Sequence, residues 1–168
     1  ESSFCNNGSI HGALPADDRF GTLNSAYEFN GSSDYIGLGT LQNTGFATGD
    51  FTVSAWIWID TPKRHWVLSN YEQGPALSPT LLAIGAENFN GNAVLHLDLR
   101  KPNTATLDVL GTTTIGLNEW HHVVVVKSGT TIAAYLDNLL EISENFQTTG
   151  DLNNGYIYQI GTEDGAQF

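Results

Sequence analysis

Methionine is missing altogether from this chain of 168 residues, and cysteine occurs once, at Cys5. A single cysteine excludes a disulfide within the chain, so Cys5 is either free or paired with a thiol outside it. Because there is no initiating methionine and no signal peptide, we expect a processed or excised piece of a longer polypeptide. The chain also has no apolar run of about 18 residues, so we expect no membrane insertion.

Basic residues are scarce. Six lysines and arginines stand against 18 acids, which gives a net charge of −12. The bases are scattered, at Arg19, Lys63, Arg64, Arg100, Lys101 and Lys127. Nucleic acids and anionic membranes require a clustered positive field, so neither is expected as a partner. The acid excess favours solubility in a salty or extracellular medium, and the alternative is that some acids bind a cation.

A helical period is also missing, whereas short runs of β-branched and aromatic residues recur between turn signals. This pattern, with 18 glycines, predicts one domain over residues 1–168 that is an antiparallel β-sandwich or barrel. Residues 1–24 are expected to be mostly loop. Strands are expected at residues 9–13, 26–29, 34–38, 51–59, 66–69, 80–84, 93–100, 105–110, 120–126, 131–137 and 155–160.

The clearest element is a β-hairpin over residues 117–138, with a turn at residues 127–130 that contains Gly129. The run of four valines at residues 123–126 leaves little polar alternation, so we expect this arm to be covered on both faces. Residues 51–59 alternate more cleanly. One face carries Phe51, Val53, Ala55, Ile57 and Ile59, and the other carries Thr52, Ser54, Trp56 and Trp58. The first face is expected to be core, and the two indoles of the second should lie about 7 Å apart.

Four segments in this order carry a family resemblance: residues 27–36, residues 51–57, residues 118–123 with 135–137, and residues 160–161. They resemble the laminin G-like domains of the concanavalin A-like lectin/glucanase superfamily, in the variant found in large secreted bacterial proteins. The resemblance implies a jelly-roll sandwich, a secreted or cell-surface location, and core positions for Trp56, Trp120 and Phe51. Asn138 stands where the family usually has glycine, although asparagine tolerates a left-handed turn.

Candidate ligand-binding residues are of two kinds. Trp58 and Trp66 are predicted to stack on a sugar ring, with packing in the core or at its rim as the alternative. His96, Asp98 and Arg100 share one face of a strand whose other face is leucine, and they are predicted to line a glycan groove. The alternative for this polar stripe is a solvated sheet face.

Calcium is the predicted cofactor, because loop residues offer the oxygen ligands that it takes six to eight at a time. The candidates are Asn30, Asp34, Asp151, Glu163 and Asp164. Several members of the family that the chain resembles bind calcium in loops at one edge of the sandwich. His121 and His122 are not a candidate pair, because adjacent residues in a strand point to opposite faces.

These features predict a non-catalytic module that recognises a glycan or a protein surface within a larger adhesin or polysaccharide-processing protein. The first alternative is a polysaccharide lyase or hydrolase. Retaining hydrolysis requires two carboxylates about 5 to 5.5 Å apart, and the strand at residues 94–100 offers Asp98 alone. The second alternative is a structural subunit. In related domains the first and last strands pair with each other, so a neighbouring subunit or the rest of a longer chain would complete the sheet. The remaining alternative is that residues 9–13 and the tail after Gly161 close the sheet themselves.

Overall fold

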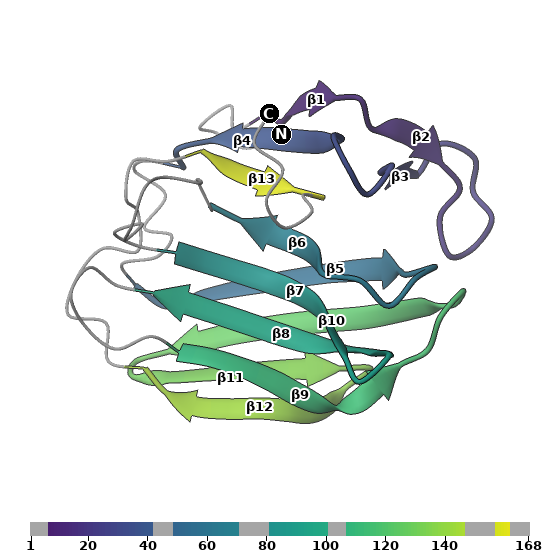
Figure 1. Ribbon diagram of the computed structural model, residues 1–168. Coiled ribbons are helices and arrows are strands. Elements are labelled where there is room, and N and C mark those ends of the chain that lie inside the picture. The colour runs from purple at the N-terminus through teal and green to yellow at the C-terminus, as the bar shows by residue number, and fades with distance from the viewer. Residues whose placement is uncertain (1–6, 42–48, 71–80, 101–106, 147–156, 162–168) are drawn as a thin grey trace.

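The computed structural model describes residues 7–41, 49–70, 81–100, 107–146 and 157–161 (Figure 1). Within these ranges there are 13 strands and no helix, and every strand pair is antiparallel. No helix in the part of the chain that the structure describes is long and apolar enough to cross a membrane. The predicted antiparallel β-sandwich is confirmed.

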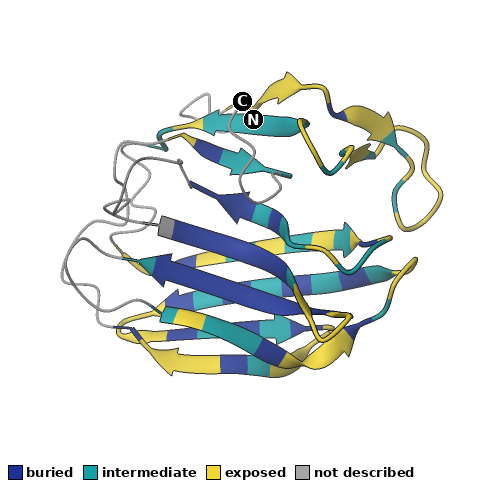
Figure 2. Ribbon diagram, in the orientation of Figure 1, coloured by how far each residue is buried: buried dark blue, intermediate teal, exposed yellow. Residues whose placement is uncertain are grey.

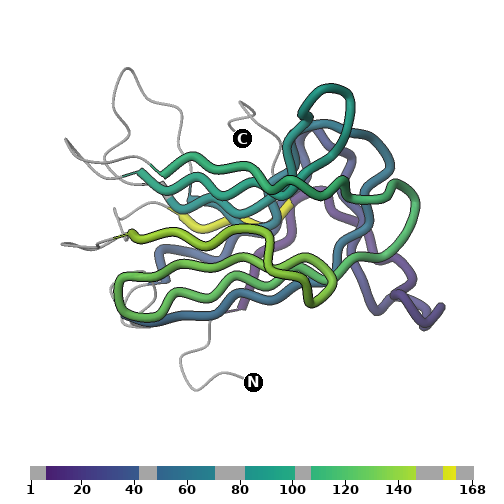
Figure 3. The backbone as a smooth tube through the Cα atoms, turned by 90° about the horizontal axis from the view of Figure 1, so that it is seen from below, coloured from purple at the N-terminus to yellow at the C-terminus, as the bar shows by residue number. Residues whose placement is uncertain are grey.

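Two sheets pack face to face, as Figures 1 and 3 show from different sides. The large sheet has the order β1 (Ser9–His11), β4 (Tyr35–Gly39), β13 (Tyr158–Ile160), β6 (His65–Ser69), β7 (Leu81–Phe89), β8 (Asn92–Arg100) and β9 (Leu107–Ile115). The small sheet has the order β12 (Leu139–Asn145), β11 (Thr131–Leu136), β10 (Trp120–Ser128) and β5 (Phe51–Trp58). A separate hairpin joins β2 (Leu14–Ala16) to β3 (Ala26–Glu28).

Period-two alternation builds the core between the sheets. On β8, Leu95, Leu97 and Leu99 are at most 1% exposed, and they face Val123 and Val125 of the small sheet within one apolar cluster. Figure 2 shows β7 and β8 as the most buried part of the large sheet. Burying a leucine or valine side chain fully contributes about 1.5 to 3 kcal/mol to the free energy of unfolding. The buried side chains of β7 and β8 therefore account for much of the stability.

Two tight turns fix the registers of the hairpins. Asn90 and Gly91 have φ values of 52° and 85° between β7 and β8, and Asp137 and Asn138 have 49° and 70° between β11 and β12. Positive φ at both central residues is the type I′ geometry that matches the twist of a two-residue hairpin. The expectation that Asn138 would tolerate a left-handed turn is therefore confirmed.

Several sequence expectations need correction. Trp56 and Trp120 were expected in the core, but both lie on the outer face of the small sheet, where Trp56 is 43% exposed. They follow the strand alternation, which sends Phe51, Val123 and Val125 inward instead. The valine run is covered on one face only, because Val124 and Val126 are half-buried on the outside. Strands β2 and β12 were not predicted.

Glu141 of β12 connects the two sheets along one side of the sandwich. Its carboxylate accepts hydrogen bonds from the backbone N–H of Thr112 (3.2 Å) and Thr113 (3.0 Å) and from Thr113 Oγ1 (2.7 Å), all on β9. Burial acts to raise the pKa of Glu141, but these hydrogen bonds outweigh it and hold the pKa below its ordinary value of 4.5. The ionised carboxylate therefore stabilises the folded state.

We expect Glu141→Gln to lower the free energy of unfolding by about 1 kcal/mol at pH 7, a shift of about 2 to 4 °C in Tm. Because the folded-state pKa is depressed, the difference from the native protein should be full above pH 4.5 and shrink as the pH falls further. Thermal melts at pH values above and below 4.5 test this pH dependence, with Glu144→Gln on the same strand as the control. An equal effect of both variants at every pH would contradict the bridging role.

Candidate functional site

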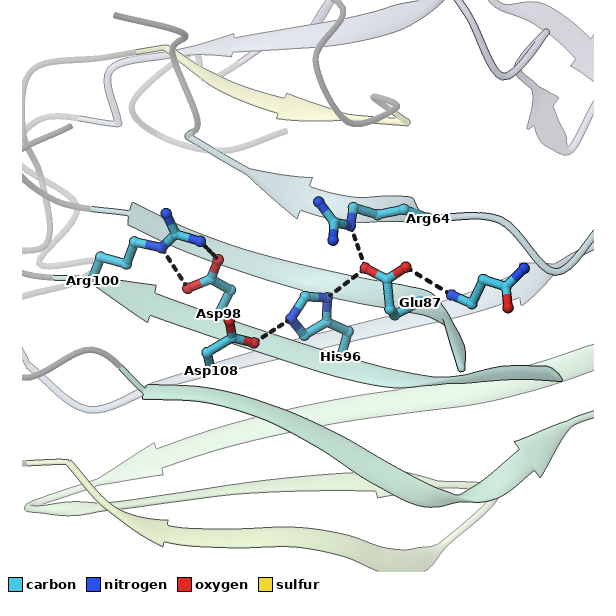
Figure 4. A network of polar contacts seen from close by, with 7 residues as sticks. Arg64, Glu87, His96, Asp98, Arg100 and Asp108 are labelled. Carbon is cyan, nitrogen blue, oxygen red and sulfur yellow. Dashed lines mark hydrogen bonds and ion pairs between the residues drawn. The ribbon is translucent and has the colours of Figure 1, made fainter. Parts of the chain in front are cut away.

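Six charged or polar side chains gather on the outer face of the large sheet, and we call them the polar network (Figure 4). They are Arg64, which precedes β6, Glu87 of β7, His96, Asp98 and Arg100 of β8, and Asp108 of β9. Arg64 donates a hydrogen bond to Glu87, whose Oε2 lies 3.7 Å from His96 Nδ1. His96 Nε2 lies 2.9 Å from Asp108 Oδ1, and Arg100 donates two hydrogen bonds to Asp98, at 2.6 and 3.0 Å.

A glycine allows Trp66 to cover this network. Trp66 of β6 pairs with Gly85 of β7, and Gly85 pairs with His96 of β8, so the three residues lie in one row across the sheet. A Cβ at Gly85 would lie 2.9 Å from the indole of Trp66. Because Gly85 has no side chain, the indole extends over β7 and its ring centroid lies 4.9 Å from that of His96. Trp66 is only 5% exposed as a result.

The polar network is buried at its centre and exposed at its ends. The side chains of His96 and Asp98 are 5% and 3% exposed, whereas those of Arg64, Arg100 and Asp108 are 36%, 43% and 55% exposed. A ligand on this face would therefore meet the two guanidinium groups and Asp108, while Glu87, Asp98 and His96 would hold them in place.

The network also brings together three groups that could ligate a metal. One ligand atom each from His96, Asp98 and Asp108 lies within 4.8 Å of the others. However, both oxygens of Asp98 accept hydrogen bonds from Arg100, and Asp108 is bonded to His96. Each carboxylate already has a cationic or ring N–H partner, so the arrangement fits paired charges better than an ion site or a pair of catalytic acids.

The outer face of the small sheet carries a second cluster of Trp56, Trp58, Trp120 and His122, which we call the aromatic face. Directly opposed pairs across β5 and β10 build it. The rings of Trp56 and His122 stack at 4.8 Å, and those of Trp58 and Trp120 meet edge to face at 5.9 Å. Trp56 and Trp58 are 43% and 51% exposed, so the face is open to solvent.

The loop between β2 and β3 extends this face. Its Arg19 guanidinium lies 4.1 Å from the ring centroids of both Trp56 and Phe20. Asp18 holds the loop by accepting hydrogen bonds from the backbone N–H of Thr22 (2.8 Å) and Phe20 (2.9 Å), which lower the pKa of Asp18. Arg19, Trp56 and His122 therefore form a continuous stack from the loop to β10.

A cleft of about 940 Å³ lies beside the aromatic face, between β5 and the β2–β3 hairpin. Tyr27, Phe29, Trp56, Trp58 and Trp120 supply most of its aromatic lining. Its charged groups are Asp17, Asp18, Arg19, Glu28, Asp60 and Lys63. The combination of apolar walls and a few polar groups is typical of ligand-binding clefts.

The structure divides the five predicted ligand-binding residues between two surfaces. Trp66, His96, Asp98 and Arg100 lie together in and over the polar network, whereas Trp58 lies on the opposite sheet. The sequence analysis missed Arg64, Glu87 and Asp108, which meet β8 only through strand pairing, and Arg19, which arrives on a loop. The alternation of residues 51–59 did place Trp56 beside Trp58.

The predicted calcium residues are only partly described. Asp151, Glu163 and Asp164 lie outside the described residues. Asn30 Oδ1 accepts hydrogen bonds from the backbone N–H groups of Ser32, Ser33 and Asp34, and Asp34 Oδ2 accepts one from Asn30. These oxygens hold their own turn, so the two residues alone do not fit the six to eight ligands of calcium. Calcium binding stays a prediction.

The two packed antiparallel sheets define a β-sandwich. The chain belongs to the concanavalin A-like lectin/glucanases superfamily, because the laminin G-like family profile of that superfamily matches residues 30–168. No curated protein matches the chain in a sequence search.

Solved structures with the same fold include three binding domains. Domain 4 of the extracellular arabinanase AbnA from Geobacillus stearothermophilus, in complex with arabinotriose, has a TM-score of 0.67 at 16% identity, over 96% of this chain and 77% of that one. A carbohydrate-binding module from Bacillus subtilis has a TM-score of 0.51 at 16% identity, over 94% of this chain and 89% of that one. The binding domain of botulinum neurotoxin serotype D has a TM-score of 0.64 at 14% identity, over 98% of this chain and 40% of that one.

Arg100→Gln should destabilise the protein by about 2 kcal/mol, because it leaves the buried carboxylate of Asp98 without its guanidinium partner. The double variant Arg100→Gln with Asp98→Asn should recover part of this loss, since the buried charge is then removed. Urea denaturation of the native protein, the two single variants and the double variant gives a coupling energy between Arg100 and Asp98, expected at about 1 to 3 kcal/mol. Strictly additive effects would show that the pair is not coupled.

If calcium binds, it should raise the free energy of unfolding by about 2.7 kcal/mol at a hundredfold excess over its Kd. Melting curves with added calcium and with a chelator measure this. A Tm that is the same in both conditions would rule out a stabilising calcium site.

Proposed function

We propose that the chain is a non-catalytic glycan-binding module whose ligand stacks on Trp58. The observation that carries the proposal is the half-exposed indole of Trp58, held edge-on by Trp120 and placed beside Trp56. An indole supplies a flat apolar surface that matches the apolar face of a sugar ring, and little entropy is lost because the ring is already held.

Polar groups next to Trp58 supply hydrogen bonds for sugar hydroxyls. Arg19, Asp60 and Lys63 line the cleft that opens beside the aromatic face. The net charge of −12 opposes polyanionic polysaccharides, so a neutral glycan is the favoured ligand class. By contrast, Trp66 is 5% exposed and offers no open ring face on the other sheet.

The structural neighbours support a carbohydrate ligand. One is described as a carbohydrate-binding module and another was solved with arabinotriose. Their structural similarity at 16% identity establishes a common fold alone, and the ligand class is our inference for this chain. A secreted or cell-surface location, within a larger adhesin or polysaccharide-processing protein, fits this role.

Trp58→Ala should abolish glycan binding and leave Tm nearly unchanged, because the side chain is half exposed and lies outside the core. Arabino-oligosaccharides and a glycan array, each with and without calcium, provide the ligands. Phe89→Ala is the matched control, since Phe89 is 52% exposed at the end of β7, on the other sheet.

Full glycan binding by Trp58→Ala would contradict the proposed surface. Product analysis on the same polysaccharides completes the experiment. Release of shortened or unsaturated products would support the lyase or hydrolase alternative instead.

A further inference from the structure

Arg19 has neither a hydrogen bond nor an ion pair with any residue that the structure describes. Its guanidinium carbon lies 4.1 Å from the ring centroids of both Phe20 and Trp56. By contrast, Arg64 and Arg100 are each paired with a carboxylate. In a chain with 18 acids and six bases, a guanidinium whose N–H donors are left without an acceptor points to a ligand that supplies one.

The loop between β2 and β3 fixes this guanidinium in place. Asp18 accepts hydrogen bonds from the backbone N–H groups of Phe20 and Thr22, so its carboxylate is already occupied. Backbone hydrogen bonds from Asp18 to Thr22 (3.1 Å) and from Gly21 to Asp18 (2.9 Å) close the same turn. Arg19 is nevertheless exposed, so its N–H groups are held in one position and accessible to a ligand.

Trp56 holds Arg19 rather than a sugar. The ring of His122 stacks on Trp56 at 4.8 Å with an interplanar angle of 18°, and Ser54 Oγ lies 2.9 Å from His122 Nε2. Because Arg19 and His122 both lie against the indole, Trp56 supports the guanidinium, and Trp58 is left as the sugar platform. Alternate side chains of a strand lie about 7 Å apart, so Arg19 lies one step along β5 from that platform.

On the basis of the glycan-binding function proposed above, we propose that Arg19 selects the glycan through the sugar unit next to the one stacked on Trp58. Its guanidinium donates two parallel hydrogen bonds to two vicinal hydroxyl oxygens of that unit. The planar fork of N–H groups spans two adjacent oxygens, which an ammonium group does not match. The ligand class is therefore a neutral oligosaccharide in which the unit beside the stacked one has free vicinal hydroxyls.

A carboxylate would also match the geometry of the fork, but the charge of the cleft disfavours it. The charged lining contains two bases, Arg19 and Lys63, against four acids, which are Asp17, Asp18, Glu28 and Asp60. An acidic sugar would be repelled by this lining, whereas hydroxyl groups can also donate hydrogen bonds to the acids.

Titration calorimetry with defined trisaccharides tests this assignment. The probes are arabinotriose, cellotriose, mannotriose and galactotriose, which all carry free vicinal hydroxyls, and trigalacturonic acid as the carboxylate probe. Singly deoxygenated analogues of the tightest neutral trisaccharide then locate the hydroxyls that are recognised. We expect loss of either hydroxyl of one vicinal pair to weaken binding about tenfold or more, and trigalacturonic acid to bind more weakly than the neutral parent.

Arg19→Lys keeps the positive charge and removes the fork. It should weaken binding of the neutral parent about tenfold and bind the parent and its deoxygenated analogues equally well. Lys63→Gln is the control, because it removes a charge from the same cleft and should keep the native ratio between parent and analogues. Both side chains are exposed, so Tm should stay unchanged in both variants.

Two results would overturn the role of Arg19 and leave the glycan-binding function standing, provided that Trp58→Ala still abolishes binding. The first is the same preference for the parent over its deoxygenated analogues in Arg19→Lys as in the native protein. The second is tightest binding of trigalacturonic acid, which would assign Arg19 to an acidic sugar. No binding of any trisaccharide to the native protein would overturn both proposals.

Discussion

The candidate binding surface depends on the register between β5 and β10. Eight consecutive pairs place Trp58 opposite Trp120 and Trp56 opposite His122. The same pairs direct Phe51, Val123 and Val125 into the core, so burial of the apolar face fixes the register that displays the indoles. A slip of one residue would send the rings inward and the valines outward. The register that packs the core is therefore the same register that exposes the indoles on these two strands.

The two outer faces of the sandwich differ in how their polar and aromatic residues are exposed. On the large sheet, Gly85 lets Trp66 lie over His96, and the charged groups pair with one another, although the buried Nδ1 of His96 has no hydrogen-bond partner. On the small sheet, Trp56 and Trp58 remain open to solvent and are supported from β10. A paired network with a buried centre stabilises its own geometry, whereas a preformed aromatic surface is available to a ligand.

The sequence predicted the elements whose burial depends on local alternation. The hairpin over residues 117–138 and the strands at residues 51–59 and 93–100 are confirmed. Strand β12 was missed because it is an edge strand in which Ile142 alone is fully buried. The partners of His96 could not be predicted, because Glu87 and Asp108 come from neighbouring strands whose register the sequence does not reveal. Trp56 was assigned to the core from family resemblance, although its alternation pointed outward.

The most direct test of the glycan-binding account uses the four tryptophans as reporters. Their indole N–H signals can be assigned by single substitution and followed by NMR while the best-binding glycan is titrated. The account predicts that the signals of Trp58 and Trp56 shift with the same Kd, while that of the buried Trp66 stays in place. Shifts confined to Trp66 would contradict it and assign the ligand to the polar network on the large sheet.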